Sequence, residues 1–156
     1  MDVLENGYTL PFEKYPDCEY EEENNASAKN DMAFVRKTVR EWEEQGVVQL
    51  VKVKPAAVSP LTVASRIMED GSVKKRLCFD GSRFINPRLQ KQKVNLAHLQ
   101  NALEITEKGD WQAVYDLSNA FFHVQIWSGH QKFLGASFEL EDGRKKYFKY
   151  KVCLSG

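Results

Sequence analysis

One carboxylate, Asp116, follows a short apolar run and precedes the aromatic residue Phe121 by five positions. The alternation of residues 113–116 is typical of a β-strand and leaves Asp116 near the strand's carboxyl end. In proteins, one or two carboxylates hold Mg²⁺ while substrate phosphates and water complete its coordination. This spacing therefore indicates phosphoryl transfer assisted by a metal, with Phe121 placed to pack against the sugar of a nucleotide.

Asp116 also has a simpler interpretation, as the N-cap of a short helix over residues 120–123. Asp is a preferred capping residue because its carboxylate accepts hydrogen bonds from the first free amide groups of a helix. Taken alone, this segment favours the cap over the metal ligand. Other parts of the chain are needed to decide between the two.

Residues 111–126 resemble the first catalytic motif of retroelement reverse transcriptases, in which an acid is followed by four variable residues and an aromatic. Further segments between Val35 and Gly156 resemble other motifs of that family, in the family's order. They are a fingers helix ending in Glu-x-Gly (35–48), a Ser-Pro strand (57–63), a fingers hairpin ending in Arg, three residues and Asp (70–80), and a palm hairpin leading toward a Pro-Phe-Gly-Leu motif (131–156). Residues 79–82, 94–100 and 132–135 are most similar to DIRS-type and Pao-like retrotransposons.

The resemblance implies catalysis by two Mg²⁺ ions. Asp116 would be the catalytic carboxylate and a metal ligand, and the backbone carbonyl of Leu117 would be a further ligand. The double-aspartate hairpin that carries the family's other metal ligands is missing from the sequence. We therefore expect a fragment truncated before the second catalytic motif, which has no polymerase activity alone.

The resemblance also implies a binding site for the incoming nucleotide. The backbone amides of Asn119 and Ala120 would hold the triphosphate, and Phe121 would exclude ribonucleotides by filling the space of the 2′-hydroxyl. Arg76 would reach the phosphates from the fingers hairpin, since its planar charged group suits them. The basic residues expected to contact nucleic acid are Lys74, Lys75 and Arg83.

Each of these roles has a structural alternative. Asn119 could be a helix cap, Phe121 a core residue and Arg76 an ordinary surface arginine. The chain also departs from the family: Met68 and Glu69 stand where a lysine is usual.

The implied function is that of a retrotransposon RNA-directed DNA polymerase, here its fingers and upper palm. Its partners would be an RNA or DNA template-primer and a deoxynucleoside triphosphate, together with the missing C-terminal palm, thumb and ribonuclease H regions. The alternative is a domesticated remnant without catalysis, which binds nucleic acid or a protein.

Net charge divides unevenly along the chain. The 156 residues are neutral overall, but residues 1–31 hold nine acidic and two basic side chains, which leaves +7 on the rest. Such an acidic stretch predicts a flexible, solvated segment that precedes the folded part. The basic remainder suits phosphates, although a charged run is often only a solvated face.

The composition, with 42% apolar residues, predicts a globular domain. No long apolar run predicts a membrane span, and no secretory signal is recognisable, so we expect an intracellular protein of the cytoplasm or nucleus. The three cysteines, Cys18, Cys78 and Cys153, lack metal-ligand spacing and are expected to be reduced.

Periodicity predicts an α+β fold in which an antiparallel β-ribbon and a partial palm sheet pack with helices. Val35, Val39 and Trp42 predict a helix that stops at Gly46. Strands are predicted over 47–53, 61–67, 76–79, 131–140 and 146–152, and a second helix over 96–103. We expect three parts: the acidic segment 1–31, a fingers-like subdomain 32–110 and a partial palm 111–156.

Overall fold

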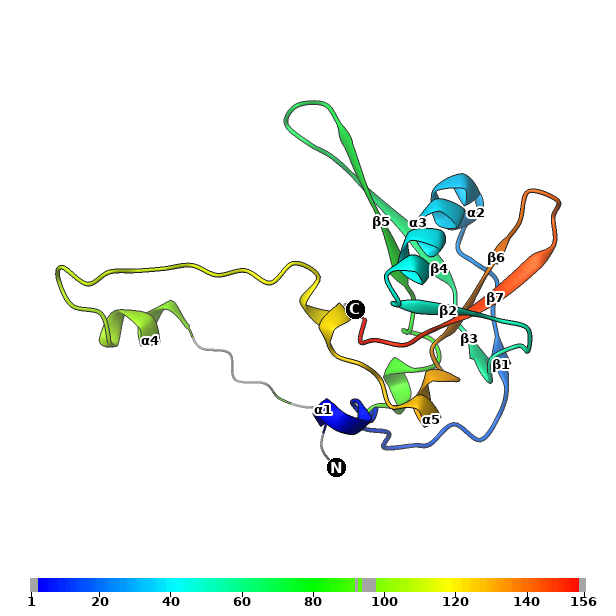
Figure 1. The fold of residues 1–156 in the computed structure, drawn as a ribbon, viewed down its shortest axis with the longest axis horizontal. Helices are drawn as coiled ribbons and strands as arrows, with labels where there is room; N and C mark the ends of the chain where they lie inside the picture. The colour runs from blue at the N-terminus through cyan, green and yellow to red at the C-terminus, as the bar shows by residue number, and fades with distance from the viewer. Residues whose placement is uncertain (1–2, 92, 94–97, 155–156) are drawn as a thin grey trace.

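The computed structural model describes residues 3–91, 93 and 98–154. It has the α+β fold that the sequence predicts: a mixed five-stranded sheet in the order β1-β3-β6-β7-β2 and a two-stranded ribbon, β4-β5 (Figure 1). The strands are β1 (Tyr20–Glu21), β2 (Val48–Val51), β3 (Ala57–Val58), β4 (Leu61–Ile67), β5 (Val73–Phe79), β6 (Gly135–Glu139) and β7 (Lys145–Tyr150). The helices are α1 (Val3–Asn6), α2 (Ala26–Lys29), α3 (Met32–Glu44), α4 (Leu99–Glu104) and α5 (Ser128–Gln131), with 3₁₀ helices η1 (Asn86–Arg88) and η2 (Ala120–His123).

Helix α3 lies where the sequence predicts a helix and packs against β2 and β6. Its stripe of Val35 and Val39 is buried, which removes apolar surface from water. The helix ends before Gly46, whose φ of +75° is a conformation that glycine adopts without strain. The core continues into the sheet, where Phe148 and Tyr150 of β7 are fully buried.

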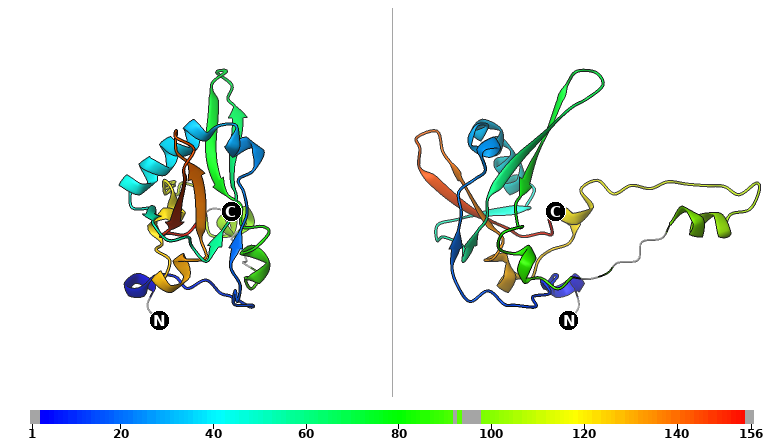
Figure 2. Two further views of the ribbon diagram at one scale, coloured as in Figure 1. Left: turned by 90° about the vertical axis from the view of Figure 1, so that its right-hand side faces the viewer. Right: turned by 180° about the vertical axis from the view of Figure 1, so that it is seen from behind.

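The ribbon β4-β5 is the predicted antiparallel hairpin, and seven residue pairs join its strands, from Leu61 with Phe79 to Ile67 with Val73. Strand β5 begins three residues earlier than predicted, at Val73. The base of the ribbon is buried and its far end is exposed. Figure 2 shows that it projects from the body separately from the β6-β7 hairpin.

The acidic segment is not a flexible linker, and this prediction was wrong. Strand β1 pairs in parallel with β3, Ala28 is buried, and the ring of Tyr20 stacks on Phe84 at 4.4 Å between centroids. The side chain of Asn24 also joins the segment to two strands: its Nδ2 donates to the carbonyl of Ser137 and its Oδ1 accepts from the amide of Leu61. The main sheet thus includes strands from all three predicted parts of the chain.

The predicted strand that leads to Asp116 is also wrong. Trp111, Val114 and Tyr115 are 101%, 95% and 92% exposed, and residues 98–119 extend away from the body (Figures 1 and 2). A β-strand needs a neighbouring strand to hydrogen-bond with, and no strand of the described part of the chain pairs with residues 111–117. The second predicted helix is present as the shorter α4, while residue 96 lies outside the described residues.

Within the residues that the structure describes, no helix is both long enough and apolar enough to cross a membrane.

Candidate functional site

A cleft of about 770 Å³ lies between α3, β5 and the start of η2. Strand β5 contributes Lys74, Lys75 and Arg76 to its lining, and the turn before η2 contributes Asn119. Four of the predicted nucleotide- or nucleic-acid-binding residues therefore border one space, although they come from segments more than 40 positions apart. Helix α3 adds one carboxylate, Glu41.

Two of the three cations on β5 are free. Lys74 and Arg76 are exposed and have no carboxylate partner among the described residues. They lie two positions apart on a strand, so their side chains leave on the same face. Lys75, by contrast, forms an ion pair of 2.6 Å with Asp31. The strand thus presents two unneutralised positive charges on one of its faces.

Asn119 is the only described residue other than glycine with a positive φ, at +52°. Asparagine tolerates this left-handed conformation better than most residues. It stands at the N-cap of η2, as its structural alternative predicts, but its side chain makes no capping hydrogen bond. The side-chain amide of Asn119 is therefore not used within η2 and can hydrogen-bond a ligand in the cleft. Ala120 is the first residue of η2.

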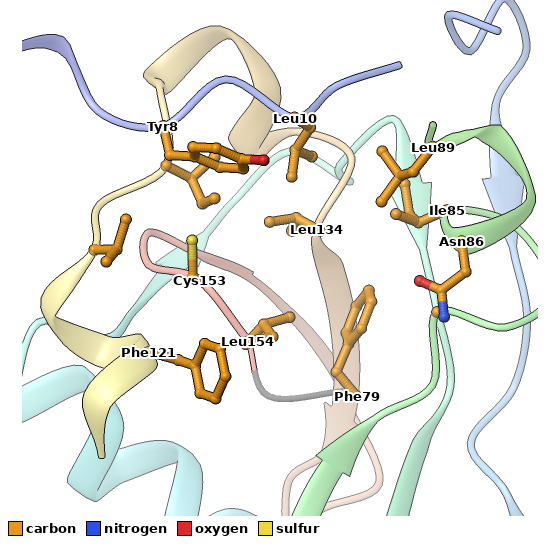
Figure 3. A pocket seen from close by; sticks show the side chains of 13 residues that line it. Tyr8, Leu10, Phe79, Ile85, Asn86, Leu89, Phe121, Leu134, Cys153 and Leu154 are labelled. Carbon is orange, nitrogen blue, oxygen red and sulfur yellow. The ribbon is translucent and has the colours of Figure 1, made fainter. Parts of the chain in front are cut away.

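A second, mostly apolar cavity of about 400 Å³ adjoins the cleft, and Phe121 lines it (Figure 3). Phe79 and Leu154 border both spaces, so the two are neighbours. Phe121 is 54% exposed, which excludes its alternative as an ordinary core residue. The remaining lining is apolar apart from a few polar side chains, among them Asn86.

Asp116 lies outside both spaces. Its side chain is exposed, it lines neither the cleft nor the cavity, and the N-cap of the nearest helix is Asn119. The capping alternative for Asp116 is therefore wrong. In the described part of the chain, no group of three or more His, Cys, Asp or Glu side chains is arranged to hold a metal ion. One carboxylate, with the exposed Leu117 beside it, does not fit a site for two Mg²⁺ ions.

Arg83 lies apart from the cleft as well. It follows β5 in the loop before η1, where it is exposed and forms an ion pair with Glu22. The positive charge of Arg83, which is predicted to contact nucleic acid, is therefore neutralised by Glu22 of the same chain.

Several residues that line these two spaces are not among the site residues predicted from the sequence. Phe122 and Tyr150 line the cleft, and Tyr8 and Leu10 line the apolar cavity. The adjacent rings of Phe121 and Phe122 could have indicated two separate spaces, because neighbouring residues of a helical turn point in different directions. One ring thus faces each space.

No protein-family model matches this chain, and no curated protein matches its sequence.

Proposed function

We propose that this chain is the fingers and upper-palm part of a retrotransposon RNA-directed DNA polymerase, and that its cleft binds phosphates of a nucleotide or of a template-primer. The observation that carries the proposal is that Lys74, Arg76 and Asn119 border one cleft. The resemblance to reverse transcriptases implies related roles for all three residues, in binding phosphates or nucleic acid.

The charges of the cleft favour a phosphate. Lys74 and Arg76 have no carboxylate partner in the described residues, and a nucleic acid releases its condensed counterions when its phosphates meet such cations. The guanidinium of Arg76 can also donate two parallel hydrogen bonds to phosphate oxygens. Glu41 lies on the α3 side of the cleft, where its negative charge would repel an anion and favour binding of that anion near β5.

The neighbouring cavity suits the rest of a nucleotide. Its apolar lining, with the half-exposed ring of Phe121, offers a surface against which a sugar or base can pack. Because Phe79 and Leu154 border both spaces, one bound molecule could reach from the cations to the ring. This arrangement supports Phe121 as the residue that tests the sugar of an incoming nucleotide.

In a longer polymerase, Asp116 and the carbonyl of Leu117 would contribute to binding Mg²⁺, which would neutralise phosphate charge during nucleotidyl transfer. The companion carboxylates would have to come from outside the described residues.

A second function, binding without catalysis, is favoured by the position of Asp116. Its exposed side chain lies outside the cleft and belongs to no group of three or more His, Cys, Asp or Glu side chains in the described residues, yet the cations of the cleft are assembled without it. A domesticated remnant would need only the cleft. The reading frame beyond Gly156 separates the two proposals, because a polymerase requires a Tyr-x-Asp-Asp-like hairpin there.

Binding by the cleft can be tested with Arg76→Gln and the matched control Arg40→Gln. Both arginines are exposed and have no ion pair in the described part of the chain. Fluorescence anisotropy with a labelled primer on an RNA template should show about tenfold weaker binding for Arg76→Gln, since a hydrogen bond to a charged group is lost. The slope of log affinity against log salt should also fall by about 0.7–0.9. Equal affinities for the two variants would contradict the proposal.

A further inference from the structure

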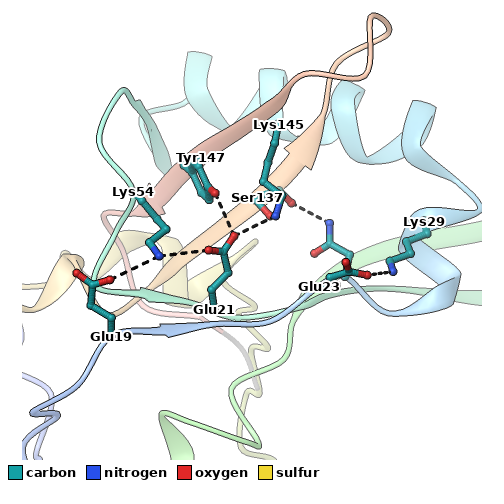
Figure 4. Close-up of polar contacts among 9 residues, drawn as sticks. Glu19, Glu21, Glu23, Lys29, Lys54, Ser137, Lys145 and Tyr147 are labelled. Atoms are coloured by element: carbon teal, nitrogen blue, oxygen red, sulfur yellow. Dashed lines mark hydrogen bonds and ion pairs between the residues drawn. The ribbon is translucent and has the colours of Figure 1, made fainter.

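Acidic residues of segment 19–31 lie beside basic side chains from the rest of the chain. Figure 4 shows Glu21 between Lys54 and Lys145, at 3.3 and 3.0 Å, with Glu19 also 3.6 Å from Lys54. Two more pairs join this segment to the β-ribbon and the loop after it: Asp31 with Lys75, and Glu22 with Arg83.

The last two pairs involve two of the three cations that the sequence predicts to contact nucleic acid. Lys75 and Arg83 each have a carboxylate partner, whereas Lys74 and Arg76 have none among the described residues. The acids therefore neutralise cations selectively and leave one face of β5 positive.

The carboxylates do not depend on these ion pairs for their position. Backbone pairing of β1 with β3 fixes the segment before Glu22, and the hydrogen bonds of Asn24 and Asn25 to β4 and β6 fix it between Glu22 and Asp31. Asp31 immediately precedes α3. The segment thus places two carboxylates beside two cations through contacts that do not involve those carboxylates.

We propose that Glu22 and Asp31 compete with phosphates for Arg83 and Lys75, and so confine phosphate binding to the face of the ribbon that carries Lys74 and Arg76. This inference rests on the proposed function and names the residues that restrict its site. A single-stranded RNA or DNA that reached beyond Lys74 and Arg76 would meet Lys75 and Arg83 already paired with carboxylates, and would gain no contact there. Both acids are positioning residues, since they act on the ligand through the cations that they hold.

The test compares the double variant Glu22→Gln/Asp31→Asn with Glu13→Gln/Asp17→Asn. Both lose two negative charges from the same acidic segment, but Glu13 and Asp17 form no ion pair with described residues. At 0.15 M salt, exposed charges more than about 8 Å apart are largely screened, so the control should bind a labelled single-stranded RNA like the parent. The first variant should bind roughly three- to tenfold more tightly, as expected when two weak ion pairs no longer compete. Its salt slope should steepen by about 1.4, or about 0.7 for each new phosphate contact.

Lysine acetylation read by mass spectrometry gives a second measurement. Bound RNA should protect Lys74 in the parent, and both Lys74 and Lys75 in the Glu22→Gln/Asp31→Asn variant. Thermal unfolding by circular dichroism shows which variants are folded, and the single variants Glu22→Gln and Asp31→Asn replace the double variant if it unfolds. Equal affinity and equal protection in the two double variants would overturn the competition while leaving the binding function intact. RNA binding by none of the proteins, parent included, would overturn the proposed function and this inference with it.

Discussion

The hydroxyl of Tyr150 is fully buried in the core and has no hydrogen-bond partner among the described residues. Burial raises the pKa of this phenol, with a smaller contribution from Cys78, so the group stays neutral. A buried polar group without a partner loses its hydration without compensation.

We predict that Tyr150→Phe is neutral or raises the free energy of unfolding by up to about 1 kcal/mol, because it removes the unpaired hydroxyl. Urea denaturation measures the change. Tyr147→Phe is the matched comparison: its hydroxyl donates a 3.0 Å hydrogen bond to Glu21, so its loss should cost roughly 0.5–1.5 kcal/mol. The prediction fails if Tyr150→Phe is the more destabilising of the two.

His130 makes the stability of the fold depend on pH. Its Nδ1 accepts a hydrogen bond from the amide of Leu10 at 3.0 Å, which requires the neutral ring. Burial lowers the pKa of His130 from its usual 6.5, and the charge of Lys132 lowers it further. The unfolded chain therefore binds a proton more readily than the folded one, and acid favours unfolding.

We predict that the free energy of unfolding changes little between about pH 7.5 and 8 and decreases as the pH falls through 6.5 toward the lower pKa of the folded state. Urea titrations at several pH values between about 5 and 8 measure this slope. His130→Gln should be less stable at about pH 8 but should lose the slope. If the variant and the parent keep the same slope, another group causes it.

At the scale of residues, the positions of Arg76 and Asn119 were more predictable from the sequence than the position of Asp116. Arg76 and Asn119 lie in or beside short, locally determined elements, β5 and η2, and these bring them to one space. Asp116 depends on a strand that needs a partner from elsewhere, and no pairing partner exists in the described part of the chain.

Among the elements, β3 and β6 meet at a single pair of residues, Val58 and Gly135. A Cβ added at Gly135 would lie 2.4 Å from the carbonyl oxygen of Ala57 and 2.5 Å from Cβ of Pro55. The glycine thus permits the close approach that joins the two halves of the sheet.

We predict that Gly135→Ala lowers the free energy of unfolding by about 3 kcal/mol, because the backbone of β3 must move to relieve the overlap. Gly71→Ala is the comparison, since its φ of +80° is strained for alanine but no atom lies within 4 Å of the new Cβ. That variant should lose only about 1 kcal/mol. Chemical denaturation of both variants measures these losses. If Gly135→Ala loses no more stability than Gly71→Ala, β3 and β6 can move apart without cost.

Elements with a clear local pattern were predictable from the sequence, and the two-residue strands were not. Helix α3 and the two hairpins follow from the spacing of their apolar residues. Strands β1 and β3 have two residues each, too few for any periodicity, and tertiary contacts alone define them. The acidic composition of residues 17–31 suggested a solvated segment because composition does not register the hydrogen bonds of Asn24 and Asn25.

On the scale of the whole molecule, the cationic cleft does not include Asp116, and the described residues hold no group of three or more His, Cys, Asp or Glu side chains that could bind a metal ion. We predict that the purified chain shows no Mg²⁺-dependent extension of a labelled primer on an RNA template, even when it binds that template. A full-length reverse transcriptase in the same buffer serves as the positive control. Extension that disappears in Asp116→Asn would contradict the prediction and would mean that Asp116 acquires partners in solution.

Residues 98–119 give the molecule a built-in optical probe. The indole of Trp111 is wholly in water, whereas those of Trp42 and Trp127 pack against Phe122 and His130. Fluorescence emission from a hydrated indole lies at longer wavelength than emission from a packed one, and acrylamide quenches it more readily. If another strand, domain or ligand covers Trp111, the tryptophan emission will shift to shorter wavelength. This change can be measured without attaching a label to the chain.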